Sequence, residues 1–177
     1  MKSLKQFGFA VTLALTVLLT SCSGSDDNGG GGGSASLGTL KAKVGGNSFT
    51  SMEAATFATK QVVGGLTTII IQGSTASGKA IQLILTGTDG NAGTFEISDT
   101  AGISAIASYT EVNISNPMDS QTWAAPYESS GVVGSITISE ITETNVKGTF
   151  NFTAKNQEGA DTKSVTNGAF NINFTSN

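Results

Sequence analysis

The sequence predicts an all-β domain, an antiparallel sandwich or flattened barrel of about eight to ten strands. Apolar and polar residues alternate with a period of two in many short segments, as in strands with one buried and one wet face. Clusters of Gly, Asn, Asp and Ser separate these segments, as in hairpins. No amphipathic helical stripe persists after residue 36. The pattern leaves the choice between a sandwich and a barrel open.

The first strands of the domain follow from short apolar runs with turn residues between them. The predicted strands are Leu40–Val44, a segment that resumes at Phe49, Thr67–Ile71, Ile81–Leu85 and Thr94–Ile97. The predicted turns are Gly45–Asn47, Gly73–Gly78 and Gly87–Gly93. Gly, Asn and Asp favour these turns because they tolerate the backbone of tight connections.

The strongest alternation lies in the last third of the chain. The predicted strands there are Ser135–Ser139, Val146–Ala154 and Gly168–Phe174, and a further strand is predicted before them at Ser108–Ile114. Side chains predicted to face the core are Val146, Phe150, Phe152, Phe170, Ile172 and Phe174. Side chains predicted to face water are Lys147, Thr149, Asn151, Thr153, Asn171 and Asn173. One wet and one dry face is the pattern of antiparallel sheets.

A cleaved signal helix is predicted for residues 1–21. Lys2 and Lys5 make a basic start, and the apolar stretch from Phe7 to Leu19 carries no charge. As a helix of about 1.5 Å per residue this stretch would be roughly 20 Å long, short of the ~30 Å hydrocarbon core. It therefore fits a secretory leader better than a membrane span.

Leu19-Thr20-Ser21-Cys22 resembles the lipobox of bacterial lipoproteins. The resemblance implies cleavage just before Cys22, diacylglycerol on its thiol and acylation of the new amine. Several acyl chains, at about 0.8 kcal/mol per buried methylene, would anchor the chain firmly. We therefore expect the membrane to be a partner through the lipid on Cys22. The alternative is an ordinary secretory leader with an incidental cysteine near the cut.

Residues 22–36 are predicted to be the lipidated cysteine and a flexible Gly/Ser-rich tether, followed by a single β-domain over residues 37–177. Ser25, Asp26 and Asp27 resemble the acidic export signal of surface lipoproteins of the Bacteroidetes. That resemblance implies lipid anchoring in the outer membrane with the domain on the cell surface. If the two aspartates only solubilise the tether, the domain would remain on the periplasmic face.

The order of these segments resembles a family of small Bacteroidetes lipoproteins that share an uncharacterised domain. Besides the lipobox, the matching segments are Ala42–Phe49, Gly148–Ala154 and Val165–Phe170. The resemblance implies an all-β fold over most of residues 37–177. It implies no catalytic residues, because its motifs specify strands and turns.

Composition excludes several functional classes. The chain has 13 acidic residues against 9 Lys+Arg, and all of the basic residues are lysines. Without arginine or a lysine cluster, nucleic acid is not an expected partner. With no histidine and one cysteine, the usual zinc ligand sets and Ser-His-Asp or Cys-His catalytic groups cannot form. We expect neither a cofactor nor a metal.

Three segments outside the leader carry candidate chemistry. Trp123 and Tyr127 lie in a long segment, residues 115–131, predicted to be a loop between strands. Their rings would either form an exposed platform for a glycan or a protein partner, or fold back over an open end of the sheet; we favour the second. Asp89–Gly93 would suit calcium but is more typical of a turn. Glu140 and Glu143 are the closest carboxylates of the domain, yet strand spacing places them on opposite faces.

These observations favour a non-catalytic lipoprotein, a binding or accessory module that takes a glycan, a small ligand or a protein partner. Two alternatives remain open at this point. The first is a structural, fimbria-like subunit of the envelope, although the exported chain lacks the arginine at which known pilins of this kind are matured. The second is a glycan hydrolase that uses carboxylates alone, with Glu140 and Glu143 as its acids. We do not expect an enzyme.

Overall fold

The computed structural model describes residues 33–175, which form eleven β-strands and two short 3-10 helices. The strands are β1 (Thr39–Val44), β2 (Asn47–Thr50), β3 (Thr56–Val63), β4 (Leu66–Ser74), β5 (Lys79–Thr88), β6 (Gly93–Ser98), β7 (Ser104–Glu111), β8 (Gln121–Ala125), β9 (Val132–Ile141), β10 (Asn145–Asn156) and β11 (Thr162–Asn173). The helices are η1 (Glu53–Ala55) and η2 (Pro117–Asp119). Within the described range, no helix could cross a lipid bilayer. The predicted all-β class is confirmed, with one strand more than the expected range.

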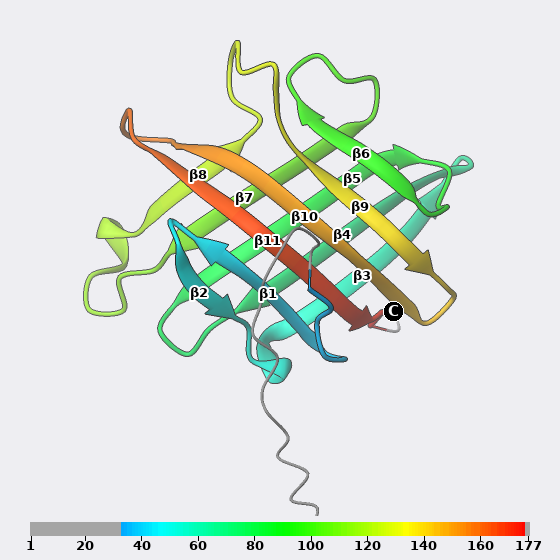
Figure 1. Ribbon diagram of the computed structural model, residues 1–177, viewed down its shortest axis with the longest axis horizontal. Helices are drawn as coiled ribbons and strands as arrows, with labels where there is room; N and C mark the ends of the chain where they lie inside the picture. The colour runs from blue at the N-terminus through cyan, green and yellow to red at the C-terminus, as the bar shows by residue number, and fades with distance from the viewer. Residues whose placement is uncertain (1–32, 176–177) are drawn as a thin grey trace, which may run out of the picture. The chain divides into compact units, whose positions relative to one another are not determined.

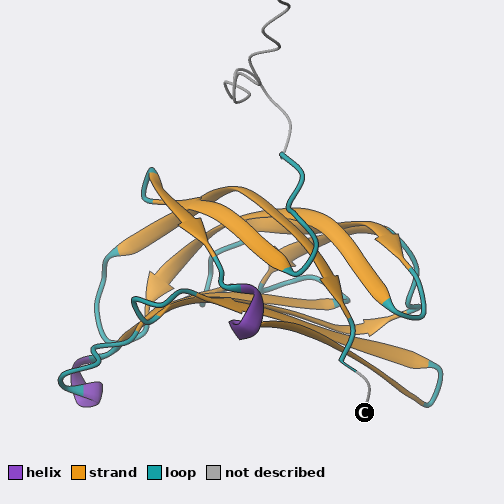
Figure 2. Ribbon diagram, turned by 90° about the horizontal axis from the view of Figure 1, so that it is seen from below, coloured by secondary structure: helices purple, strands orange, loops and turns teal. Residues whose placement is uncertain are grey.

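All eleven strands belong to one curled antiparallel sheet (Figure 1). Its main path runs β2-β1-β11-β10-β8-β7-β5-β4-β3. The long strand β10 is the branch point, because one end pairs with β8 and the other with β9, which in turn pairs with β6. Figure 2 shows that the sheet curls into two facing layers. The domain is therefore a flattened half-barrel.

The curl is partly closed along β3. Ala58 forms an isolated parallel bridge with Phe174, and the backbone N–H of Thr175 donates to the Ala58 carbonyl at 2.8 Å. Nearby, the N–H of Met52 donates to the carbonyl of Ser74 at 2.9 Å, which ties the segment after β2 to the end of β4. These bonds join the two flanks of one continuous sheet. They favour the flattened barrel over two separate sheets.

The core fills the space between the two layers, and its side chains alternate along each strand. Of the six predicted inward residues, five are at most 3% exposed: Val146, Phe150, Phe152, Phe170 and Ile172. The sixth, Phe174, is partly buried against the same cluster. The opposite layer contributes Ile69, Ile71, Ile81, Leu83 and Leu85. Each such side chain stabilises the fold by about 1.5–3 kcal/mol through burial, so the core is the main source of stability.

Two strands depart from the predicted positions. The strand expected at residues 108–114 begins and ends earlier, because Ala105, Ala107 and Tyr109 face the core while Val112 and Ile114 are exposed. Strand β3 was not predicted at all. It buries one residue, Ala58, so its sequence shows no alternation.

The long loop expected over residues 115–131 is the clearest error. Gln121–Ala125 form β8, which pairs with β7 and with the end of β10. Trp123 and Ala125 face the core from this strand and are 4% and 0% exposed. The strand has five residues and two prolines near it, so turn residues masked its short alternation.

Candidate functional site

A hollow of about 410 Å³ opens at one end of the half-barrel. Four segments line it: the β1–β2 turn, the β4–β5 turn, the last residues of β7 and the first residues of β11. Its volume falls within the range of roughly 300–1,000 Å³ that is common for small-molecule sites. Three charged side chains, Lys79, Glu111 and Lys163, line this open space, so we take the hollow as the candidate site.

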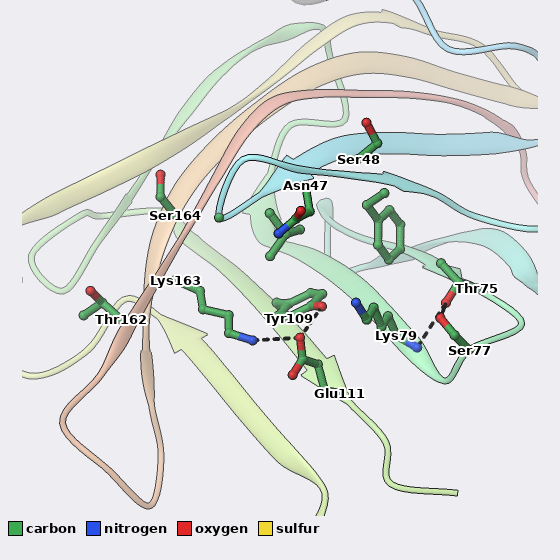
Figure 3. Close-up of a pocket in the computed structure, with 13 residues that line it drawn as sticks. Asn47, Ser48, Thr75, Ser77, Lys79, Tyr109, Glu111, Thr162, Lys163 and Ser164 are labelled. Carbon is green, nitrogen blue, oxygen red and sulfur yellow. Dashed lines mark hydrogen bonds and ion pairs between the residues drawn. The ribbon is translucent and has the colours of Figure 1, made fainter.

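The side chains around the hollow fall into two groups, which point to opposite sides of their strands. Figure 3 shows five labelled side chains that converge on the hollow: Asn47, Lys79, Tyr109, Glu111 and Lys163. Three others on the same strands point away from this group: Ser48, Thr162 and Ser164. This alternation follows because neighbours in a strand face opposite sides of the sheet.

The tight β1–β2 turn places Asn47 over the hollow. Gly45 and Gly46 both have a positive φ, 55° and 83°. Two consecutive residues with positive φ are typical of a two-residue hairpin turn, where glycine avoids the strain that other residues would suffer. Val44 then pairs with Asn47, so the first side chain of β2 lies beside the last of β1.

Lys163 and Glu111 form an ion pair in the hollow, with 2.7 Å between the ammonium nitrogen and Oε1. The hydroxyl of Tyr109 donates to the same Glu111 oxygen, also at 2.7 Å. The pair of Lys163 and Glu111 is the single ion pair within residues 33–175. The three groups come from β11 and β7, which are brought together by the curl of the sheet.

An aromatic layer lies against this ion pair. The Lys163 ammonium is 3.8 Å from the ring centroid of Trp123 and 5.1 Å from that of Tyr109, distances at which a cation is attracted by the ring face. The Trp123 indole N–H donates to Asp161 at 2.8 Å. Phe49 meets Tyr109 edge-on, with 6.5 Å between centroids. The ammonium of Lys163, a residue that lines the hollow, thus lies over the ring face of the buried Trp123.

The network fixes the charge state of its members. Burial raises the pKa of Tyr109 well above its usual value, and the hydrogen bond to Glu111 and the carboxylate charge raise it further. Burial acts to raise the pKa of Glu111 too. The hydrogen bonds from Lys163 and Tyr109, with the charges of Lys163 and Lys79, outweigh burial and hold that pKa below its usual value. At neutral pH the phenol is therefore protonated and the carboxyl ionised.

The residues predicted for lipidation and export cannot be compared with this geometry. Cys22, Ser25, Asp26 and Asp27 lie outside the described residues. The lipid anchor and the surface address therefore stay predictions from the sequence.

Trp123 and Tyr127 are now placed. Trp123 is buried within β8, so its ring is not an exposed platform. Tyr127 follows the same strand, is half-buried, and has the Lys155 ammonium 6.0 Å from its ring centroid. A role of this segment in ligand binding stays a prediction.

The carboxylates that the sequence suggested lie away from the hollow. Glu140 is exposed near the end of β9, and Glu143 is exposed in the turn before β10. In the Asp89 turn, both carboxylate oxygens accept hydrogen bonds from Asn91, from its backbone N–H and from its amide. Within residues 33–175 no group of three or more His, Cys, Asp or Glu residues could hold a metal ion.

Lys79, Glu111 and Lys163 were not singled out from the sequence. They are far apart in the chain, and only strand register brings them together: Lys79 is the cross-strand partner of Glu111. One signal was available. Charged residues are 12% of the chain, and Lys163 occupies an inward position two residues before the buried Val165. A charge at an inward position marks a residue that has a specific partner.

The fold and the hollow define a class: a small all-β domain with a polar, partly charged cavity at one end of a flattened half-barrel. Within that class, the chain belongs to the family described as domain of unknown function DUF6252, whose model matches residues 38–172. The predicted resemblance to an uncharacterised domain family is thereby confirmed at this level. No curated protein and no solved structure matches the chain.

Proposed function

We propose that this chain is a lipid-anchored envelope protein whose β-domain is a non-catalytic binding module, with its ligand site in the hollow at the end of the half-barrel. The supporting observation is the convergence of Asn47, Lys79, Glu111 and Lys163 on one open space of about 410 Å³. Convergent polar groups in a concave site are the usual basis of small-molecule recognition.

The direction of the chain suits such a role. The first strand begins at Thr39 and ends at Val44 beside the hollow. The segment that leads back to Cys22 therefore joins β1 at the end away from the hollow. The point at which the predicted tether joins the domain is therefore separate from the proposed ligand site.

The membrane address is tested by replacing Cys22 with serine. We expect the Cys22→Ser protein to lose its membrane association completely, because the hydroxyl cannot carry the thioether-linked lipid. Detergent-phase partitioning of cell fractions measures this change. Ser23→Ala is the matched control, since it alters the next residue and keeps the thiol. Protease accessibility on intact cells then distinguishes the cell surface from the periplasmic face.

A Cys22→Ser protein that is processed and still partitions into detergent would overturn the lipid anchor. That result would not affect the proposed binding role of the β-domain, because the binding role depends on residues 33–175.

The binding role is tested by filling the hollow. Trp123 is the only tryptophan and contacts Lys163 of the network, so its fluorescence reports on ligands that enter. A panel of glycans and small polar metabolites should contain a ligand that changes this fluorescence and raises the melting temperature. Asn47→Tyr, which places a larger side chain in the hollow, should weaken that ligand by about tenfold or more.

Thr50→Tyr is the control for size and aromaticity, because Thr50 is exposed on the same strand and is not among the residues that line the hollow. It should leave the affinity unchanged. Equal loss in both variants, or a ligand that binds with the hollow filled, would place the binding site elsewhere.

A further inference from the structure

The charges in the hollow do not cancel. Lys163 is paired with Glu111 at 2.7 Å. Lys79, the second lysine of the lining, makes no ion pair within residues 33–175 and its ammonium donates no hydrogen bond there. The lining therefore holds two positive charges and one negative charge, in a chain whose formal net charge is −4. The hollow keeps one uncompensated positive charge.

Further donor capacity points into the same space. The amide of Asn47 has no hydrogen-bond partner among the described side chains and faces the hollow from the β1–β2 turn. Lys79 faces it from the start of β5, with its side chain directed toward Tyr109 (Figure 3). An ammonium and an amide that face the same hollow can both donate to one carboxylate of a ligand. Lys79 is exposed, so the attraction will be screened by salt.

The opposite wall offers an acceptor. Both hydrogen bonds to Glu111, from Tyr109 and from Lys163, end on Oε1. Oε2 of the same carboxylate accepts none from the described residues. Because the lowered pKa of Glu111 keeps its carboxylate ionised at neutral pH, this oxygen can accept a hydrogen bond from a donor on a ligand, such as a hydroxyl.

We infer that the hollow binds a hydroxylated carboxylate, whose carboxylate is held by Lys79 and Asn47 and whose hydroxyl donates to Glu111. This inference rests on the binding role proposed above and specifies its ligand class. Two sources share the chemistry: a uronic acid residue at the end of an acidic glycan, and a free hydroxy acid.

The test compares two disaccharides that differ only in whether the terminal sugar carries a carboxylate, together with free glucuronate and free gluconate. Binding of glucuronate, gluconate, a glucuronate-terminated disaccharide and the matching glucose-terminated disaccharide is measured by calorimetry and by Trp123 fluorescence. We expect the carboxylates to bind at least about tenfold more tightly than the neutral disaccharide, and less tightly as salt is raised. Preference for the disaccharide identifies the glycan source, and preference for gluconate identifies the free hydroxy acid.

Lys79→Gln should reduce carboxylate affinity by about tenfold and leave the neutral ligand unaffected. Lys79→Arg should retain most of the affinity, because it keeps the charge. Lys60→Gln removes a lysine from β3, outside the hollow, and should change nothing. Circular dichroism confirms that each variant is folded.

Equal binding of the neutral and charged disaccharides would overturn the carboxylate assignment while leaving a binding module in place. Absence of binding by all four ligands would also overturn it. The wider ligand panel, measured with the native protein and with Asn47→Tyr, then tests the proposed function independently. A neutral or cationic ligand that binds in the hollow would support a binding module with another ligand class. If no ligand of the panel binds, the proposed binding function is wrong.

Discussion

Replacing Gly148 with alanine is expected to lower the free energy of unfolding by about 3 kcal/mol or more. Gly148 lies inside β10, where a Cβ would overlap the carbonyl oxygen of Thr137 in β9. The same Cβ would lie 2.6 Å from the ring of Phe170 in β11. A backbone oxygen held in a ladder cannot move aside cheaply, so the overlap must distort the sheet.

Chemical denaturation of the β-domain measures this loss, and a thermal scan should show a melting temperature lower by roughly 10 °C. Gly102→Ala is the matched control, because a Cβ there meets nothing within 4 Å and its φ is not in the left-handed region. We expect it to change stability by less than about 0.5 kcal/mol. If Gly148→Ala were as mild as Gly102→Ala, the close packing of β9, β10 and β11 at this point would be wrong.

The two Gly-x-Phe segments of the last strands are reciprocal. In the register of β10 and β11, Gly148 is opposite Phe170, and Phe150 is opposite Gly168. A Cβ on Gly168 would lie 2.6 Å from the ring of Phe150. Each glycine therefore leaves room for the phenylalanine across from it, and the two rings stack at 6.3 Å. The arrangement resembles the packing of aromatic rings over glycines that stabilises designed sheets.

The sequence predicted the strands that contain these residues but not the pairing between them. Alternation identifies which residues of a strand face inward, so Phe150 and Phe170 were assigned to the core correctly. Alternation carries no information about register between strands. The spacing of Gly148 and Gly168 became meaningful only once the sheet placed each opposite a ring.

The candidate site could not be predicted for the same reason. Lys79, Glu111 and Lys163 belong to three strands that are separated by long stretches of chain, and no local pattern connects them. Local residue preferences also gave a wrong prediction for the segment around Trp123. Trp123 lies between prolines and turn residues, which predicted a loop, whereas pairing of β8 with β7 overrides these local preferences.

Replacing Phe170 with alanine is the second large effect that we expect, a loss of about 3–5 kcal/mol. Its side chain is 0% exposed and stacks on Phe150, so truncation removes buried area and leaves a cavity between two strands. Urea denaturation measures the loss. Phe57→Ala is the control for residue type, because Phe57 lies on β3 and is only half-buried. Its loss should be clearly smaller.

A double variant that combines Gly148→Ala with Phe170→Ala shows how much of the destabilisation comes from the Phe170 ring and how much from the Thr137 carbonyl oxygen. With the Phe170 ring removed, an alanine at position 148 still meets the carbonyl of Thr137 but no longer meets the ring. Gly148→Ala should therefore cost at least about 1 kcal/mol less in the Phe170→Ala background than in the native chain. If the double variant does not fold, Phe170→Leu provides a milder background for the same comparison. Additive losses would mean that the carbonyl alone opposes the Cβ, and that the glycine is required by β9 rather than by the ring opposite it.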